Sequence, residues 1–164
     1  MGRAVSKSLA ILACLFLSLS AYPQVPDFDA FAAETTTNTL IADIHIESHP
    51  IGKSLESELV KQVGSGVNFG GKYHLLEVGC GTQCQVLIAV DVETGDIADV
   101  VNSSIGSCFQ DDSRLLVVNP YLSAHFDGAP PDWAYTYYFE LTENGFTERL
   151  KTKDSFTGEC QYGQ

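Results

Sequence analysis

Apolar and polar residues alternate repeatedly along this chain, with the period of two that marks a half-buried β-strand. The alternation is clearest over residues 135–141, where every second position is aromatic or leucine, and it also occurs over 42–47. Asn144-Gly145 follows the first of these runs, a dipeptide favoured in tight β-turns, and residues 146–151 continue as a further strand. The chain is therefore predicted to contain an antiparallel hairpin near its end.

Upstream, runs of apolar and β-branched residues predict four more strands, at 72–78, 83–92, 96–101 and 114–118. Residues 86–90 are apolar without alternation, which is typical of a central strand covered on both faces. A tight turn at 93–95 joins two of these strands, so the first three are predicted to form a meander.

One helix is predicted, over residues 54–63. Ser54 is a suitable N-cap, Leu55, Leu59 and Val63 share one helical face, and glycine follows at position 64. About seven strands with one short amino-terminal helix predict a mostly β protein. We expect an antiparallel sheet domain, sandwich-like or partly closed, with the helix packed on it.

The first 21 residues have the layout of a secretory signal peptide. Arg3 and Lys7 precede an apolar run over residues 9–19, and small residues follow as far as Ala21. This run is shorter than the roughly 20 apolar residues of a membrane span. We therefore expect cleavage near Ala21 and a soluble periplasmic or secreted product without an integral membrane span. A lipoprotein anchored through Cys14 is less favoured, because the apolar run continues past that cysteine.

Residues 22–39 are small, polar or proline-containing and show no sustained period, so they are predicted to be a flexible linker. Residues 40–164 then form a single domain of common size. Removing residues 1–21 takes away two of the nine basic residues and none of the 21 acidic ones, which leaves a formal charge of −14. That excess argues against nucleic acid and anionic membranes as partners, because phosphate binding needs clustered lysine and arginine.

Four cysteines remain after the predicted cleavage: Cys80, Cys84, Cys108 and Cys160. An even number in an exported chain predicts two disulfides. Three pairings are possible. We favour Cys80 with Cys84 and Cys108 with Cys160, since neighbouring glycines allow the first pair to close a tight loop. Zinc binding and redox exchange fit the cysteine spacing poorly.

The segment from residue 121 to 133 holds the candidate binding residues, which are Tyr121, His125, Phe126 and Trp133. Prolines at 130 and 131 stiffen it, and exposed aromatic side chains on such a loop can stack on sugar rings or grip a peptide. The alternative, favoured because large aromatic residues are mainly buried, is that Phe126 and Trp133 fold inward over the core.

Two motifs stand near the centre of the chain, Asn68-Phe69-Gly70-Gly71-Lys72-Tyr73 and Gly79-Cys80-Gly81-Thr82-Gln83-Cys84. Together with residues 91–95 and 112–116 they resemble a set of small exported bacterial proteins of unknown function, over roughly the middle third of the chain. The first motif in those proteins commonly reads Asn-Phe-Ala-Gly-His-Tyr, so Gly70 and Lys72 depart from it, and an aromatic residue often stands where Val78 does. The resemblance implies a bacterial envelope location and carries no activity.

No catalytic residue, metal ligand or cofactor is predicted. The leading hypothesis is an exported, non-catalytic binding or interaction domain of the bacterial envelope, whose partner is an unknown envelope protein, peptide or glycan. One alternative is a hydrolase or metal-dependent enzyme using His74 or His125 with carboxylates, which requires residues on separate predicted elements to converge. Another is a purely structural envelope protein.

Overall fold

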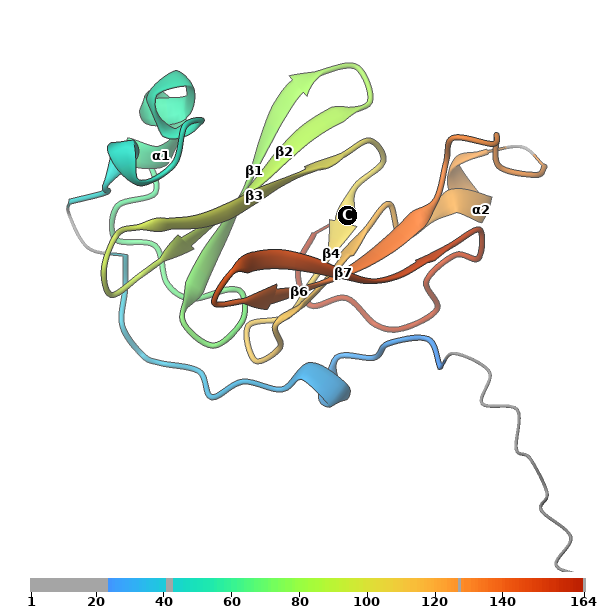
Figure 1. Ribbon diagram of the computed structural model, residues 1–164, viewed down its shortest axis with the longest axis horizontal. Coiled ribbons are helices and arrows are strands. Elements are labelled where there is room, and N and C mark those ends of the chain that lie inside the picture. The colour runs from blue at the N-terminus through green and yellow to red at the C-terminus, as the bar shows by residue number, and fades with distance from the viewer. Residues whose placement is uncertain (1–23, 41–42, 127, 164) are drawn as a thin grey trace, which may run out of the picture.

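The computed structural model describes residues 24–40, 43–126 and 128–163 (Figure 1). Within these residues seven strands form two antiparallel sheets, so the prediction of a mostly β, antiparallel domain is confirmed. The first sheet contains β1 (Tyr73–Gly81), β2 (Cys84–Asp91) and β3 (Ile97–Ser103), in that order. The second contains β4 (Ser107–Cys108), β5 (Leu115–Val118), β6 (Thr136–Thr142) and β7 (Gly145–Thr152).

The main core lies between the two facing sheets. Side chains from both sheets meet Phe69 and Phe109 there, and they are Leu75, Leu87, Ala89, Leu116, Val118 and Leu141. Strand β2 is buried from Val86 to Asp91, as its non-alternating apolar run predicted. The turn before β1 closes through paired backbone hydrogen bonds between Phe69 and Tyr73, with Gly70 and Gly71 at positive φ. A Cβ at Gly71 would lie 2.3 Å from the carbonyl oxygen of Glu34, so the close approach requires glycine.

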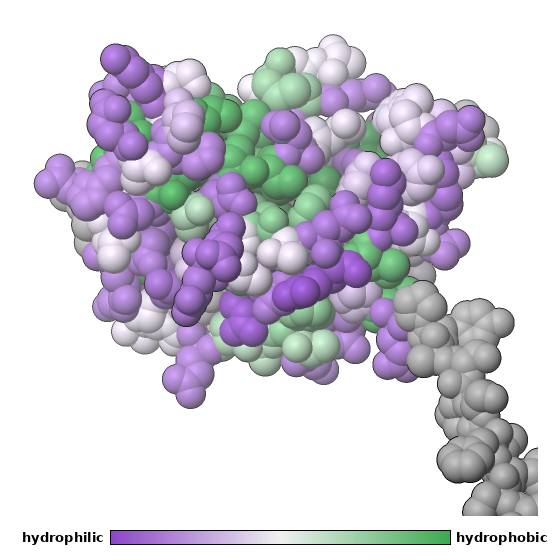
Figure 2. Space-filling view, in the orientation of Figure 1, coloured by the Kyte–Doolittle hydropathy of each residue, from purple (hydrophilic) through white to green (hydrophobic). Residues whose placement is uncertain are grey.

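The outer face of the first sheet is covered by a mainly helical segment. It contains the 3₁₀ helices η2 (Ile46–Ser48) and η3 (Gly52–Leu55) and the short α-helix α1 (Glu56–Val60). Leu40 and Leu59 are buried against Ile88 and Val90 of β2. In Figure 2 apolar side chains gather in the upper centre of the face shown, over β1 to β3.

The helix predicted over 54–63 is shorter than expected and is not capped by Ser54. The Ser54 hydroxyl donates instead to the carbonyl of Ile51, 2.8 Å away, inside the preceding 3₁₀ turn. Leu59 is fully buried but Val63 is 40 % exposed, so only part of the predicted apolar face is used. Gly52 fixes the tight geometry, since a Cβ there would lie 2.1 Å from the Ile46 carbonyl oxygen.

The strand predicted over 42–47 is wrong for the part that the structure describes. His45 makes one isolated bridge to Asp96, and η2 begins at the next residue. The Ser48 hydroxyl donates to the His45 carbonyl and accepts from the amide of Ile97. A side chain thus takes the place of the next backbone hydrogen bond that a paired strand would make. Local hydrogen bonds by serine compete with strand pairing in this way.

The outer face of the second sheet is covered by segments from near both ends of the chain. Phe28 is buried against Phe156, with ring centroids 5.6 Å apart, and both pack on Leu115, Val117 and Tyr138. The Ser113 hydroxyl donates to the Phe28 carbonyl at 2.8 Å. The described part of the segment predicted as a flexible linker therefore includes a packed section, which Figure 1 shows passing along the second sheet.

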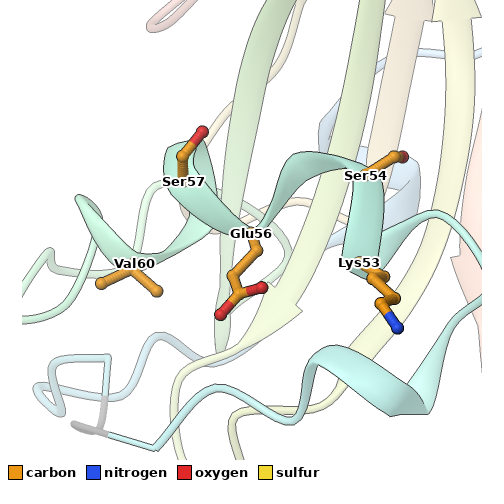
Figure 3. Close-up of a pocket in the computed structure, with 5 residues that line it drawn as sticks. All are labelled: Lys53, Ser54, Glu56, Ser57 and Val60. Carbon is orange, nitrogen blue, oxygen red and sulfur yellow. The ribbon is translucent and has the colours of Figure 1, made fainter.

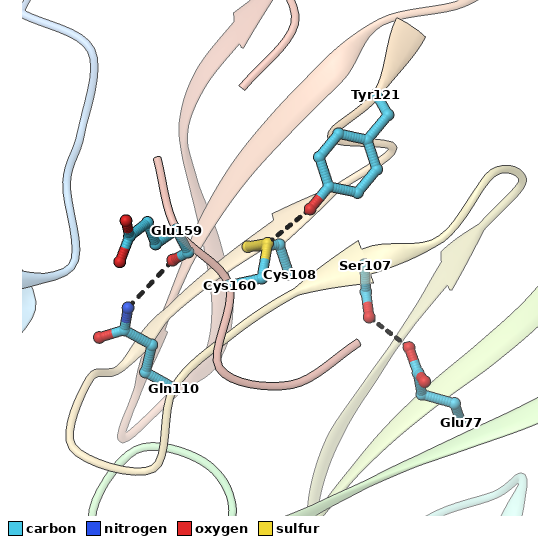
Figure 4. Close-up of a disulfide and its surroundings, with 7 residues drawn as sticks. All are labelled: Glu77, Ser107, Cys108, Gln110, Tyr121, Glu159 and Cys160. Carbon is cyan, nitrogen blue, oxygen red and sulfur yellow. Dashed lines mark hydrogen bonds between the residues drawn. A yellow bond between two sulfur atoms is a disulfide. The ribbon is translucent and has the colours of Figure 1, made fainter. Parts of the chain in front are cut away.

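The favoured cysteine pairing is confirmed. Cys80–Cys84 closes the tip of the β1–β2 hairpin with Cα atoms 5.0 Å apart, and Cys108–Cys160 joins β4 to the tail with Cα atoms 5.3 Å apart (Figure 4). In the described part of the chain, no helix has the length and apolar character needed to cross a membrane.

Candidate functional site

A hollow of about 230 Å³ opens between the end of β3 and the inner face of β6. One wall carries aromatic rings and the other carries amide and hydroxyl groups. The lining residues are Asn102, Ser104, Asn119, Trp133, Tyr137 and Phe139. This mixture of rings and polar groups is typical of small-ligand sites.

The aromatic wall follows from the alternation along β6. Tyr137 and Phe139 point to the same face as Leu116 and Val118 of the neighbouring strand, because they are paired across the ladder. Their rings stack with centroids 6.0 Å apart and an interplanar angle of 15°. Both remain half-buried, so the row of rings continues from the core to the surface of the hollow.

Trp133 stands at the outer end of this wall and is 59 % exposed. Its turn is fixed by Lys153, whose ammonium group donates to the carbonyl oxygens of Pro131 at 2.6 Å, Asp132 at 3.0 Å and Ala134 at 2.9 Å. The same ammonium group lies 3.9 Å from the ring centroid of Tyr135. The expectation that Trp133 folds inward over the core is therefore wrong, because Lys153 holds the turn with the indole outside.

Asn119 builds the polar wall. Its side-chain carbonyl accepts hydrogen bonds from the amides of Ser104 at 2.9 Å and Ile105 at 3.0 Å, and its Nδ2 donates to the carbonyl of Tyr135 at 3.2 Å. Its φ of 56° lies in the left-handed region, which asparagine tolerates better than most residues. The wall is thus pinned to both sheets.

Several polar groups around the hollow are not used by the fold. Among the described residues, none bonds to the side-chain amide of Asn102, the hydroxyls of Ser104 and Tyr137 or the indole nitrogen of Trp133. These groups are free to exchange hydrogen bonds with a ligand.

The structure brings three of the four candidate binding residues together. His125 and Phe126 meet edge to face at 4.9 Å, and Phe126 meets Trp133 in the same way at 5.7 Å. The cysteine loop joins this cluster through Gln83, whose Nε2 lies 3.2 Å from His125 Nε2. The helix α2 (Leu122–His125) positions His125 by burying Leu122.

Tyr121 lies apart from the other three. Its hydroxyl is 2.8 Å from the sulfur of Cys160, and Figure 4 shows the ring reaching toward that disulfide. Its role is therefore to contact the covalent link between β4 and the tail, and it does not line the hollow.

The histidines considered for catalysis are separated. His74 lies near the start of β1, where its Nδ1 donates to the Gly66 carbonyl at 2.9 Å, and burial lowers its pKa below the ordinary 6.5 despite that bond. His125 contacts the hairpin tip beyond the other end of β1. At about 3.3 Å per strand residue the two are roughly 20 Å apart. Within the described residues no group of three histidine, cysteine or acidic side chains is arranged to hold a metal ion.

A second hollow, of about 480 Å³, lies beside η3 and α1 (Figure 3). Its lining residues are Lys53, Ser54, Glu56, Ser57 and Val60. They all come from one continuous segment and include no aromatic ring, so this hollow offers a single wall and less to recognise than the Trp133 hollow.

The polar wall and the lysines were missed by the sequence reasoning. Alternation along 135–141 signalled that Tyr137 and Phe139 share a face, but it did not show what lies opposite. In the sequence, Asn119 is marked only by its place directly after the strand predicted over 114–118. Its contacts to Ser104 and Ile105 depend on how two sheets pack, for which the sequence holds no local signal.

No protein-family model matches this chain, and no curated protein or solved structure matches it either. The resemblance to small exported bacterial proteins therefore stays a prediction from the two motifs and residues 91–95 and 112–116.

Proposed function

We propose that this protein is an exported, non-catalytic binding domain of the bacterial envelope, and that its ligand docks on Trp133 in the hollow between β3 and β6. The observation that carries the proposal is the 59 % exposure of Trp133 beside free polar groups. A tryptophan ring offers one of the largest apolar surfaces of any side chain, and such rings are frequent anchors of binding.

Rigidity supports the same role. Lys153 fixes the turn that carries Trp133, and Asn119 fixes the opposite wall. A site held in its binding geometry loses less conformational entropy when the ligand arrives. The arrangement therefore favours recognition by a preformed surface.

The lining residues favour binding over catalysis. Asn102, Ser104 and Asn119 offer amides and a hydroxyl, while the remaining lining residues offer rings. None of these lining residues is a histidine or a carboxylate that could act as a general base toward Ser104.

Export rests on two observations. The signal-peptide pattern of residues 1–21 lies outside the described residues, so it remains a sequence prediction. The two disulfides, Cys80–Cys84 and Cys108–Cys160, suit an oxidising compartment such as the periplasm or the exterior.

The test uses the protein purified after export from an expression host, presented to arrays of oligosaccharides and of peptides with aromatic side chains. Hits are then titrated by calorimetry with the wild type, Trp133→Ala and, as a control on α1, Val60→Ala. We expect Trp133→Ala to weaken binding at least tenfold, about 1.4 kcal/mol, and Val60→Ala to leave it within twofold. If the ligands bind Trp133→Ala as tightly as the wild type, the proposal is wrong.

A further inference from the structure

We propose that the Trp133 hollow selects an acidic sugar, a pyranose ring that carries a carboxylate, with the ring stacked on Trp133 and the carboxylate bound by Lys151. This inference rests on the proposed binding function and names its ligand class.

Lys151 is placed for this role by the β6–β7 ladder. It pairs with Tyr137, a lining residue, and its ammonium group lies 4.1 Å from the ring centroid of Tyr135 and 5.1 Å from that of Tyr137. Among the described residues, no carboxylate lies within 4.0 Å of that ammonium group, and no oxygen accepts a hydrogen bond from it. Its charge is therefore held beside the hollow by ring contacts alone.

Three of the four other lysines of the described chain differ from Lys151 in this respect, and the fourth, Lys53, lines the separate hollow beside η3 and α1. Lys72 is paired with Asp91 at 2.6 Å, and Lys61 is paired with Glu58 at 2.8 Å. Lys153 uses three hydrogen bonds to backbone carbonyls. Lys151 thus keeps its donors for a carboxylate that approaches over the aromatic wall.

The polar wall distinguishes a sugar from an aromatic peptide side chain. A pyranose has apolar faces, which suit stacking on Trp133, and a hydroxyl edge, which suits the amide of Asn102 and the hydroxyl of Ser104. A peptide phenyl ring in the same place would bury those two groups without partners, at a cost of about 1–3 kcal/mol for each. The unused polar groups therefore favour the sugar.

The size of the hollow agrees with one sugar ring. Drug-sized ligands occupy pockets of about 300–1,000 Å³. A hollow of about 230 Å³ is smaller than these and accommodates a single ring, while neighbouring rings of an oligosaccharide extend into solvent.

Charge adds selectivity. The chain carries a formal net charge of −12, so most of its surface repels an anionic ligand. Lys151, on β7, and Lys153, just beyond it, both place their ammonium groups over the ring of Tyr135, at 4.1 Å and 3.9 Å from its centroid, and so bring two positive charges to this side of the hollow. An acidic sugar is therefore directed to the hollow, and its binding weakens as salt screens that attraction.

The experiment compares acidic oligosaccharides with neutral partners of the same ring size. Trigalacturonate, trimannuronate and a hyaluronan tetrasaccharide are titrated by calorimetry, and the methyl ester of each serves as the uncharged control. Emission from Trp133, the only tryptophan of the chain, reports whether the ring is covered. We expect at least one acid to bind with a shift in emission and its ester to bind at least tenfold more weakly.

Variants assign the carboxylate contact. Lys151→Met is expected to weaken binding of the acid about tenfold and of the ester less than twofold, while Lys151→Arg retains the preference for the acid. Lys61→Met, a lysine of the helical segment, is the matched control and is expected to change neither. Thermal melting checks that each variant is folded.

The outcomes separate this inference from the function on which it rests. An ester that binds as tightly as its acid, with binding still lost in Trp133→Ala, overturns the acidic-sugar inference and leaves the binding function standing. Binding of aromatic peptides to Trp133 without binding of any of the acids has the same meaning. Ligands insensitive to Trp133→Ala overturn both.

Discussion

The hydroxyl of Ser103 lies 3.1 Å from the side-chain carbonyl of Asn119 and shares its proton between that oxygen and the Gly106 carbonyl at 2.5 Å, and so it joins the end of β3 in one sheet to the residue after β5 in the other. Both side chains are buried. The same carbonyl also orders Ser104 and Ile105, which continue the wall of the hollow. One side chain therefore couples the packing of the sheets to the shape of the site.

Replacing Asn119 with alanine is expected to lower the free energy of unfolding by about 3 kcal/mol. The change leaves two backbone amides without their acceptor and places alanine at a φ of 56°, a conformation that alanine tolerates less well than asparagine. Urea unfolding measures the loss. Asn119→Gly removes the hydrogen bonds but tolerates that φ, so it is expected to lose about 1 kcal/mol less. An alanine variant within 0.5 kcal/mol of the wild type, which is about the effect of an ordinary surface substitution, would show that these contacts are dispensable.

Lys153→Met is expected to release the turn that carries Trp133. Three hydrogen bonds from one exposed ammonium group are lost, and their net value is about 1–2 kcal/mol after allowance for solvent. Urea unfolding and the emission spectrum of Trp133 are measured together. Lys53→Met, an exposed lysine of η3, is expected to change stability by less than about 0.5 kcal/mol. Equal behaviour of the two variants would contradict the anchoring role of Lys153.

Phe28→Ala tests whether the segment before the first sheet belongs to the folded domain. Phe28 is 7 % exposed and packs against Phe156, so its truncation is expected to cost about 3 kcal/mol. Val25 is 54 % exposed, and Val25→Ala is the control, expected to change stability by less than about 0.5 kcal/mol. Unfolding by urea and the rate of limited proteolysis near residue 30 measure both. A Phe28→Ala variant as stable as the control would mean that the segment behaves as a linker.

His74 is expected to make the protein less stable in mild acid. Burial lowers its pKa in the folded state, so below the ordinary value of 6.5 the unfolded chain binds a proton that the folded chain resists. The stability that neutral His74 allows is fully present above pH 6.5, and it is lost as the pH falls from 6.5 toward the folded-state pKa. Urea midpoints at pH 7.5 and 5.0 are compared for the wild type and His74→Gln. The variant is expected to lose less stability between these values, and an equal loss would assign the pH dependence to other groups.

The strands were predictable because period-two alternation and turn dipeptides are local signals. Residues 135–141 and 146–151 became β6 and β7 nearly as predicted, joined at Asn144-Gly145. The two-residue strand β4 is too short to produce such a pattern. The alternation over 42–47 wrongly predicted a strand, because the Ser48 side chain bonds to the His45 carbonyl and the Ile97 amide, which a continued strand would pair through its backbone.

The site was predictable only in part. The segment from 121 to 133 was selected for its aromatic residues, and three of its four candidates cluster there. Trp133 stays outside because of Lys153, which lies 20 residues further along the chain. Lys153 binds backbone carbonyl groups, which every residue has, so the sequence does not mark them as its partners. Pairings of that kind depend on tertiary packing and leave no periodicity to detect.

The packing of Phe28 on Phe156 has a consequence for the order of folding. Each sheet is built from consecutive strands, and the chain passes from one sheet to the other once, between β3 and β4. Both sheets can therefore assemble from local contacts as the chain emerges from its amino end. Phe28 precedes every strand, yet it is buried only once Phe156, which follows the last strand, packs against it. The first buried residue of the described chain therefore reaches its packed position late in folding.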